Sequence, residues 1–195
     1  TYNGNYSDIT RSGWGVVFVS RVPDLHKAGV FYGHLPGLLQ CNYRAEVYAL
    51  FSGLSQIADH YLPGSRVQII TDCKSVGTIW DADRVPHFMD GAADIWRDVQ
   101  GLRSRVREKQ VHVSVKWVRS HLSEVDVDAG SISREDWVGN DWADVAAKKG
   151  AARHAVPGSV IKRFFTELAV SVAWLRFCVW VHQLAVCSRA WSDDD

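Results

Sequence analysis

The chain has 195 residues, enough for one domain with a full hydrophobic core and an appendage. Its 22 basic side chains equal its 22 acidic ones, so a uniformly basic nucleic-acid-binding protein is not indicated, although a local basic face is compatible with the composition. Four cysteines without metal-binding spacing are too few for a disulfide scaffold, which favours an intracellular, reducing compartment without separating cytoplasm from nucleus. The opening residues, TYNGNYSD, lack the basic and apolar regions of a signal peptide.

The amino-terminal part is predicted to contain two strands, a helix and a third strand. Residues 14–20 and 28–35 are rich in β-branched and aromatic side chains, and the polar turn between them is typical of an antiparallel pair. Residues 43–61 place apolar side chains at helical spacing, and a Pro-Gly pair follows. Residues 67–71, VQIIT, are an apolar run that predicts a buried strand.

The middle of the chain is predicted to form two helices and a further strand. Residues 73–82 favour a short helix, residues 92–110 an amphipathic helix, and residues 111–118 alternate as a strand does. The amphipathic helix carries a run of basic residues that could face a DNA strand, although a solvated face is the simpler interpretation. These basic residues are Arg97, Arg103, Arg105, Arg107 and Lys109.

A polar, acidic loop over residues 122–131 is predicted to lead into a last helix over residues 134–152. Ser133 and Asp136 are suitably spaced to cap the start of that helix. The order of strands, helix, strand, helices, strand and helix is typical of a mixed α/β sheet. We therefore predict one such domain over residues 1–155.

Residues 156–195 differ in composition and are predicted to form a helical extension with an acidic tail. Residues 159–187 are apolar on nearly all sides, and a helix of that kind must be buried in something. The segment approaches membrane-spanning length but carries Arg176 and His182. We favour a helix that packs on the domain or on other domains of a polyprotein over a membrane helix. An artefact of a cut polyprotein is the third alternative.

Three acidic residues and a histidine occupy special places in this order of elements. Glu46 lies one turn into the first helix, Asp72 ends the following strand, Asp144 lies on the last helix, and His121 follows the last strand. Clustered carboxylates repel one another unless a cation neutralises them, and oxygen ligands suit Mg²⁺ or Mn²⁺. If these elements share one sheet, we expect one cleft with a divalent metal site. Taken singly, Asp72 is equally compatible with a helix N-cap, and the others with ordinary surface residues.

Four motifs in this order and spacing resemble type 1 ribonuclease H, most closely the diverged copies found in retroelement polyproteins. The motifs are RAEVYAL, ITDCKSV, VKWVRSH and GNDWADVAAKKG, and the resemblance covers residues 1–152. It implies a five-stranded mixed sheet with helices on both faces. It also implies an endonuclease that cleaves the RNA strand of RNA–DNA hybrids with two Mg²⁺ or Mn²⁺ ions. An integrase-like or resolvase-like nuclease fits less well, because its last acid is usually placed differently and no loop histidine precedes it.

The resemblance assigns roles to several residues. Glu46, Asp72 and Asp144 match three of the four metal-binding carboxylates of the family, and His121 matches the loop histidine that assists product departure or proton transfer. Asn42 matches the asparagine that contacts the minor groove of the hybrid, where 2′-hydroxyl groups are displayed.

Further substrate contacts are expected from Arg44, Lys74 and Asn140, while the first carboxylate of the family is replaced. The family begins with a strand ending in Asp-Gly-Ser, and the corresponding run here places Asn3 in the Asp position. Asparagine is isosteric but neutral, so it offers a carbonyl oxygen without the charge. Asp8 is close enough in sequence to reach the site instead. The alternative function is therefore a catalytically silent module that binds nucleic acid or protein within a polyprotein.

Overall fold

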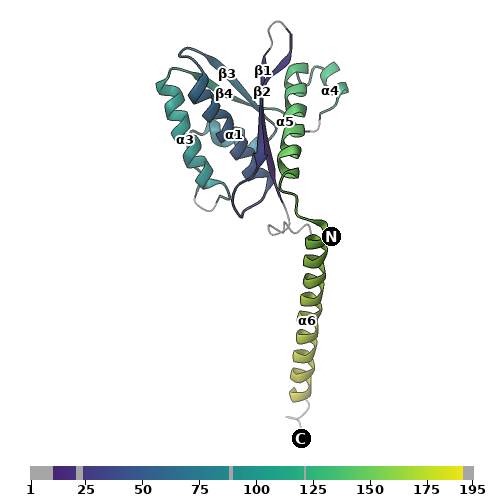
Figure 1. The fold of residues 1–195 in the computed structure, drawn as a ribbon. Coiled ribbons are helices and arrows are strands. Elements are labelled where there is room, and N and C mark those ends of the chain that lie inside the picture. Colours follow the sequence, from purple (N-terminus) through teal and green to yellow (C-terminus); the bar gives the residue numbers. More distant parts are fainter. Residues whose placement is uncertain (1–10, 21–23, 88–89, 121, 191–195) are drawn as a thin grey trace. The chain divides into compact units, whose positions relative to one another are not determined.

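The computed structural model describes residues 11–20, 24–87, 90–120 and 122–190. The chain divides into two compact units, Thr1–Ala155 and Val156–Asp195 (Figure 1). Each unit has its own set of contacts and is described by itself.

The described part of the first unit closely follows the predicted order of strands and helices. Its elements are β1 (Gly13–Ser20), β2 (His26–His34), α1 (Asn42–His60), β3 (Arg66–Thr71), α2 (Lys74–Asp81), α3 (Ala93–Glu108), β4 (His112–Trp117), α4 (Glu124–Asp128) and α5 (Arg134–Ala152). The predicted cap of the last helix is confirmed, because the Ser133 side chain accepts a hydrogen bond from the Asp136 backbone N–H. The periodicity of the sequence thus predicted the elements well.

The short helix α4 corrects one prediction, since residues 122–131 were expected to be loop throughout. The Asp126 carboxylate accepts hydrogen bonds from the backbone N–H and the hydroxyl of Ser123, both at 2.8 Å. These bonds lower the pKa of Asp126. Local capping of this kind lets five residues form a turn of helix in a segment without helical apolar spacing.

The described strands form two separate pairs. β1 and β2 are antiparallel, with Val17 opposite Val30, and β3 and β4 are parallel, with Ile69 opposite Val115. The expected five-stranded sheet is therefore not present as one sheet among the described residues. The strand expected to come first falls in residues 1–10, outside the described residues.

The hydrophobic core lies between α1, α2, α3 and the β3–β4 pair. Trp96 of α3 is fully buried, together with Leu54 and Ile57 of α1 and Val76 of α2. The Trp96 indole N–H donates to the Tyr43 hydroxyl at 3.0 Å, so the polar atom of this core side chain is satisfied. This core fixes the position of α1, which carries Glu46 and Asn42.

Helix α5 packs closely on the β1–β2 pair because glycines line the contact. A Cβ atom added at Gly15 would lie 2.6 Å from the backbone nitrogen of Ala147, and one added at Gly13 would overlap the same helix more severely. Gly150 of α5 similarly abuts the backbone of Gly33 in β2. Any side chain at these positions would displace the helix that carries Asp144 and Asn140.

The second unit consists of one helix in its described part, α6 (Gly158–Ala190). Many large apolar side chains of this helix are exposed, among them Trp174, Phe177 and Trp180. Its first 27 residues, Gly158–Leu184, are long and apolar enough to cross a membrane by length and composition. Packing of α6 on a partner remains a prediction.

Candidate active site

The three expected carboxylates come from three elements of the first unit. Glu46 lies in α1 and lines a cavity of about 430 Å³, Asp72 directly follows the last residue of β3, and Asp144 is exposed on α5. Burial, which has the largest effect, and the negative charges of Asp72 and Asp144 together raise the pKa of Glu46 to about 7. The fold therefore brings Asp72 and Asp144 near enough to oppose the ionisation of Glu46.

The surroundings of Asp72 settle one alternative interpretation. The N-cap of α2 is Cys73, so the interpretation of Asp72 as that N-cap is wrong. The Asp72 backbone carbonyl accepts a hydrogen bond from the indole N–H of Trp117 at 3.0 Å, and the Thr71 hydroxyl accepts one from the Cys73 N–H. Both bonds hold the end of β3 against β4 and α2, and so fix the backbone at Asp72.

A divalent cation fits the chemistry of this donor set. Glu46, Asp72 and Asp144 offer only oxygen ligands, and their mutual repulsion favours a positive charge between them. Among the described residues, however, no group of three or more His, Cys, Asp or Glu side chains is close enough to hold a metal ion. Asn3, Asp8 and His121 lie outside the described residues.

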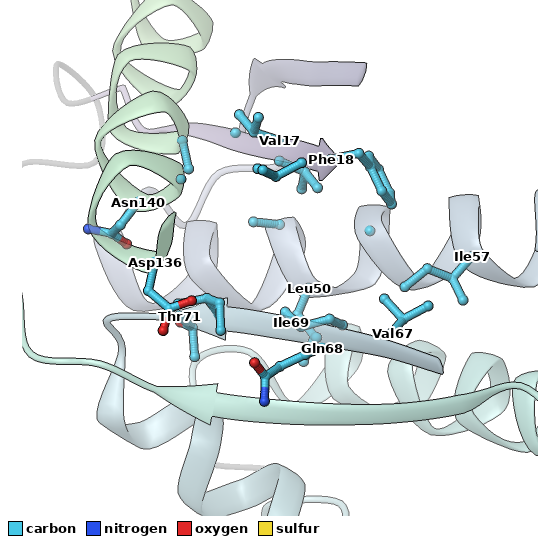
Figure 2. A pocket seen from close by; sticks show the side chains of 18 of the residues that line it. Val17, Phe18, Leu50, Ile57, Val67, Gln68, Ile69, Thr71, Asp136 and Asn140 are labelled. Atoms are coloured by element: carbon cyan, nitrogen blue, oxygen red, sulfur yellow. The ribbon is translucent and has the colours of Figure 1, made fainter. Parts of the chain in front are cut away.

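The expected substrate contacts divide into exposed and internal residues. Asn42, at the start of α1, and Lys74, at the start of α2, are both exposed, and the Lys74 ammonium lies 5.7 Å from the centre of a ring of Trp117. Asn140 lines the cavity from α5 (Figure 2). These residues are therefore placed where a ligand can reach them.

Arg44, by contrast, is held by internal contacts. Its guanidinium makes two hydrogen bonds to Asp94 of α3, at 2.6 and 2.5 Å, and a third to the Gly91 carbonyl at 2.8 Å. This bidentate pair lowers the pKa of Asp94 to about 2. The structure thus gives Arg44 a role in joining α1 to α3, and its contact with a substrate stays a prediction.

The basic side chains of α3 are also engaged within the domain. Arg103 and Arg107 both pair with Asp83 at 2.9 Å, and Arg105 pairs with Asp59 at 3.0 Å. The Lys109 ammonium donates to the Ala58 carbonyl at 2.6 Å. Because two acids, Asp83 and Asp59, pair with three of these basic side chains, α3 is a weaker candidate for a DNA-binding face than its sequence indicated.

Asp136 is a buried carboxylate whose role sequence reasoning missed. It is 4% exposed, lies beside Thr71 in the cavity wall (Figure 2), and accepts a hydrogen bond from the Lys116 ammonium at 2.7 Å. This ion pair joins α5 to β4. The sequence indicated Asp136 only as a helix-capping residue, because a pairing with a strand lysine depends on the tertiary fold.

The raised pKa of Glu46 predicts a pH-dependent stability. The folded state holds the Glu46 proton more tightly than the unfolded chain, so this stabilisation is complete below pH 4.5 and is lost as pH rises through about 7. Replacing Glu46 with Gln should leave stability nearly unchanged at pH 4.5 and increase it by up to about 3 kcal/mol at pH 8. Urea unfolding at the two pH values measures this difference.

The control for that measurement is Glu108→Gln, which neutralises an exposed carboxylate at the end of α3. This control should change stability little at either pH. An equal effect of Glu46→Gln at pH 4.5 and pH 8 would show that Glu46 titrates normally.

The amino-acid sequence itself matches no family model and no curated protein. Solved structures do match. The solution structure of the PFV RNase H domain aligns with a TM-score of 0.52 and 16% identity, covering 73% of this chain and 84% of that chain. The amino-terminal RNase H domain of rv2228c from Mycobacterium tuberculosis aligns with a TM-score of 0.49 and 15% identity, covering 75% and 97%.

A foamy viral protease-reverse transcriptase in complex with an RNA/DNA hybrid aligns with a TM-score of 0.48 and 15% identity, covering 71% of this chain. The present chain spans 17% of that protein. The likeness to the PFV domain shows that the first unit has a ribonuclease H-like fold, as the four motifs implied.

Proposed function

We propose that the domain binds RNA–DNA hybrids and is a metal-dependent endonuclease of ribonuclease H type, with Asn3 limiting cleavage by the chain as given. The observation that supports this most is the effect of Asp72 and Asp144 on the ionisation of the buried Glu46 within a ribonuclease H-like fold. Strongly perturbed carboxylates gather at catalytic sites far more often than on ordinary surfaces.

Glu46, Asp72 and Asp144 are the residues that would hold Mg²⁺ or Mn²⁺. Two such ions, when bound, activate the attacking water and stabilise the leaving oxygen of a phosphodiester. Glu46 keeps its proton to near neutral pH while no cation is close, so its ionisation is expected to accompany metal binding. We assign His121 to proton transfer or product departure, as the resemblance implies.

The proposed substrate contacts use the exposed side chains around this site. Asn42 is suited to hydrogen-bond a 2′-hydroxyl group in the minor groove, and Lys74 is suited to contact a phosphate. Asn140, in the cavity wall, is the third candidate. Because phosphate contacts dominate such binding, hybrid affinity should fall as salt concentration rises.

The alternative, a catalytically silent binding module, is favoured by Asn3. A neutral amide in the place of the first Asp supplies less charge to hold two cations against their mutual repulsion. In that case hybrid binding persists without hydrolysis.

Metal binding tests the proposed site directly. By titration calorimetry, Mn²⁺ is expected to bind somewhat more tightly than Mg²⁺, because it tolerates imperfect ligand sets. Asp72→Asn should abolish the binding, whereas Asp128→Asn, which removes an exposed acid of α4, should leave it intact. Unchanged Mn²⁺ affinity in Asp72→Asn would count against the site.

The proposal also covers what helix α6 packs on and the cellular compartment of the protein. We propose that α6 packs on another domain of a retroelement-type polyprotein, because its large apolar side chains are exposed in the described chain. The cysteine content supports a reducing, intracellular setting.

A further inference from the structure

A second cavity lies at the end of the first unit where both β2 and α5 finish. Its volume is about 370 Å³, within the range of roughly 300–1,000 Å³ that is usual for small-molecule sites. The lining side chains that can carry a charge are Arg11, His34 and His154, and no acidic residue is among the described residues that line it. We call this cavity the basic pocket.

A buried glutamine fixes the frame of the basic pocket. Gln40 is 5% exposed, and its amide oxygen accepts a hydrogen bond from the Ser12 backbone N–H at 2.9 Å. Its amide nitrogen donates to the backbone carbonyls of Leu35 and Gly37, at 3.0 and 2.7 Å. Gly37 has a φ of +89°, a left-handed conformation that glycine adopts without strain, so the loop can turn back onto Gln40. Because these bonds hold the loop between β2 and α1, a ligand would meet a largely preformed site.

Two histidines lie side by side in the wall of the basic pocket. The ring centroids of His34, the last residue of β2, and His154, just beyond α5, are 3.6 Å apart, and the ring planes are inclined by 40°. The indole N–H of Trp14 donates to the His34 carbonyl at 3.1 Å and so holds the end of β2. Each imidazole offers an N–H donor, and two protonated rings at this separation repel each other unless an anion lies beside them. The pair is therefore suited to bind an anion.

A further cation lies next to the histidine pair. The Arg153 guanidinium is 4.5 Å from the centre of the Tyr32 ring and donates to the Tyr32 hydroxyl at 3.2 Å. Tyr32 and His34 are two residues apart in β2, so their side chains lie on the same face of the strand. Arg153 in turn directly precedes His154 in the chain. The contact with Tyr32 thus holds a permanent positive charge beside the two histidines.

A phosphate group matches these donors better than a carboxylate or a metal ion does. Its oxygens are arranged tetrahedrally and can accept hydrogen bonds from several sides, whereas a carboxylate has two oxygens in one plane, and arginine is well suited to phosphate. Zinc sites usually have three or four protein ligands. Among the described residues, no group of three or more His, Cys, Asp or Glu side chains is placed to hold a metal ion.

We propose that the basic pocket binds a phosphate group through Arg11, His34 and His154. The group belongs either to a nucleic-acid strand or to a free phosphate compound, which share this chemistry. None of the described residues assigned above to hybrid binding or to metal binding lines the basic pocket. The inference therefore holds whether or not the domain cleaves hybrids.

Titration calorimetry on the full, metal-free chain at about pH 6, where an ordinary histidine is mostly protonated, tests the proposal. The probes are inorganic phosphate and an oligothymidylate without terminal phosphates. His34→Gln and His154→Gln should each weaken binding of the responding probe about tenfold, the effect of losing one hydrogen bond to a charged group. The control is His112→Gln, which changes an exposed histidine of β4 outside the pocket and should leave binding unchanged.

The two probes separate the two sources of the phosphate group. A histidine-dependent loss for inorganic phosphate alone assigns the pocket to a free phosphate compound, and such a loss for the oligothymidylate assigns it to a nucleic-acid strand. In NMR spectra of the unsubstituted chain, the ring signals of His34 and His154 should shift when the responding probe is added. This second measurement does not depend on the folding of a variant.

Three outcomes overturn the proposal. The first is that the unsubstituted chain binds neither probe. The second is that binding is unchanged in both histidine variants, which places the phosphate elsewhere. The third is that Zn²⁺ alone binds in a histidine-dependent way, which makes the pair a metal site instead.

Discussion

Asn3→Asp is expected to cleave the RNA strand of an RNA–DNA hybrid at least roughly 10²–10³ times faster than the chain as given, the factor typical of one preorganised electrostatic contact. The resemblance places Asn3 where the family has its first metal-binding Asp, so the asparagine would remove negative charge that helps to hold the cations. Single-turnover cleavage in Mg²⁺ and in Mn²⁺ measures the effect.

Hybrid affinity separates catalysis from binding in this experiment. It should be similar for both versions and fall with salt, because the proposed contacts are to phosphates and, through Asn42, to 2′-hydroxyl groups. Asn5→Asp adds the same charge nearby and is the matched control, which should not accelerate cleavage. Equal rates for the given chain and Asn3→Asp would show that Asn3 is aligned wrongly, with Asp8 the next residue to test.

Gly13→Val is expected to destabilise the domain by roughly 3 kcal/mol or more, beyond the usual range for overpacking, because the new side chain meets helix backbone rather than a mobile side chain. Gly13 lies against the backbone of Ala147 and Ala151 in α5, so the helix must move away from β1. Denaturant unfolding measures the loss. Gly13→Ala, which adds only a Cβ, should show a smaller loss of the same sign.

Gly101→Ala is the matched control for this prediction. Gly101 lies inside α3 with nothing within 4 Å of an added Cβ, so alanine should stabilise the helix by up to about 1 kcal/mol. A Gly13→Val protein as stable as the parent would mean that α5 does not lie against β1 as described. In a variant that still folds, Glu46 should titrate at lower pH, because Asp144 moves away with α5.

The sequence predicted those features that depend on local patterns. The helix at residues 42–60 and the strands around residues 69 and 115 follow from apolar periodicity, which acts over a few residues. The carboxylates Glu46, Asp72 and Asp144 were predicted from motifs in order, and the structure places them near enough to raise the pKa of Glu46.

Features that depend on distant pairing were not predictable in the same way. Arg44 and Asp94 are 50 residues apart in sequence, and no local pattern distinguishes a paired arginine from one that contacts substrate. The ion pairs Lys116–Asp136 and Arg103–Asp83 likewise join residues that lie far apart in the sequence, so no local pattern predicts them. The separation of the described strands into two pairs likewise depends on which strands meet in the tertiary fold, and no local pattern encodes it.

The contact between β1 and α5 has a consequence for the order of folding. It joins Gly13 to Ala147, residues at nearly opposite ends of the first unit, so the chain must close its longest loop to form it. Local elements such as the β1–β2 hairpin form earlier, because contacts of short sequence separation form fastest. During synthesis, α5 leaves the ribosome last among the elements of this unit. We therefore expect Asp144 and Asn140 to reach the cleft only at the end of folding, which keeps the nascent domain without its complete set of carboxylates until the whole domain has been made.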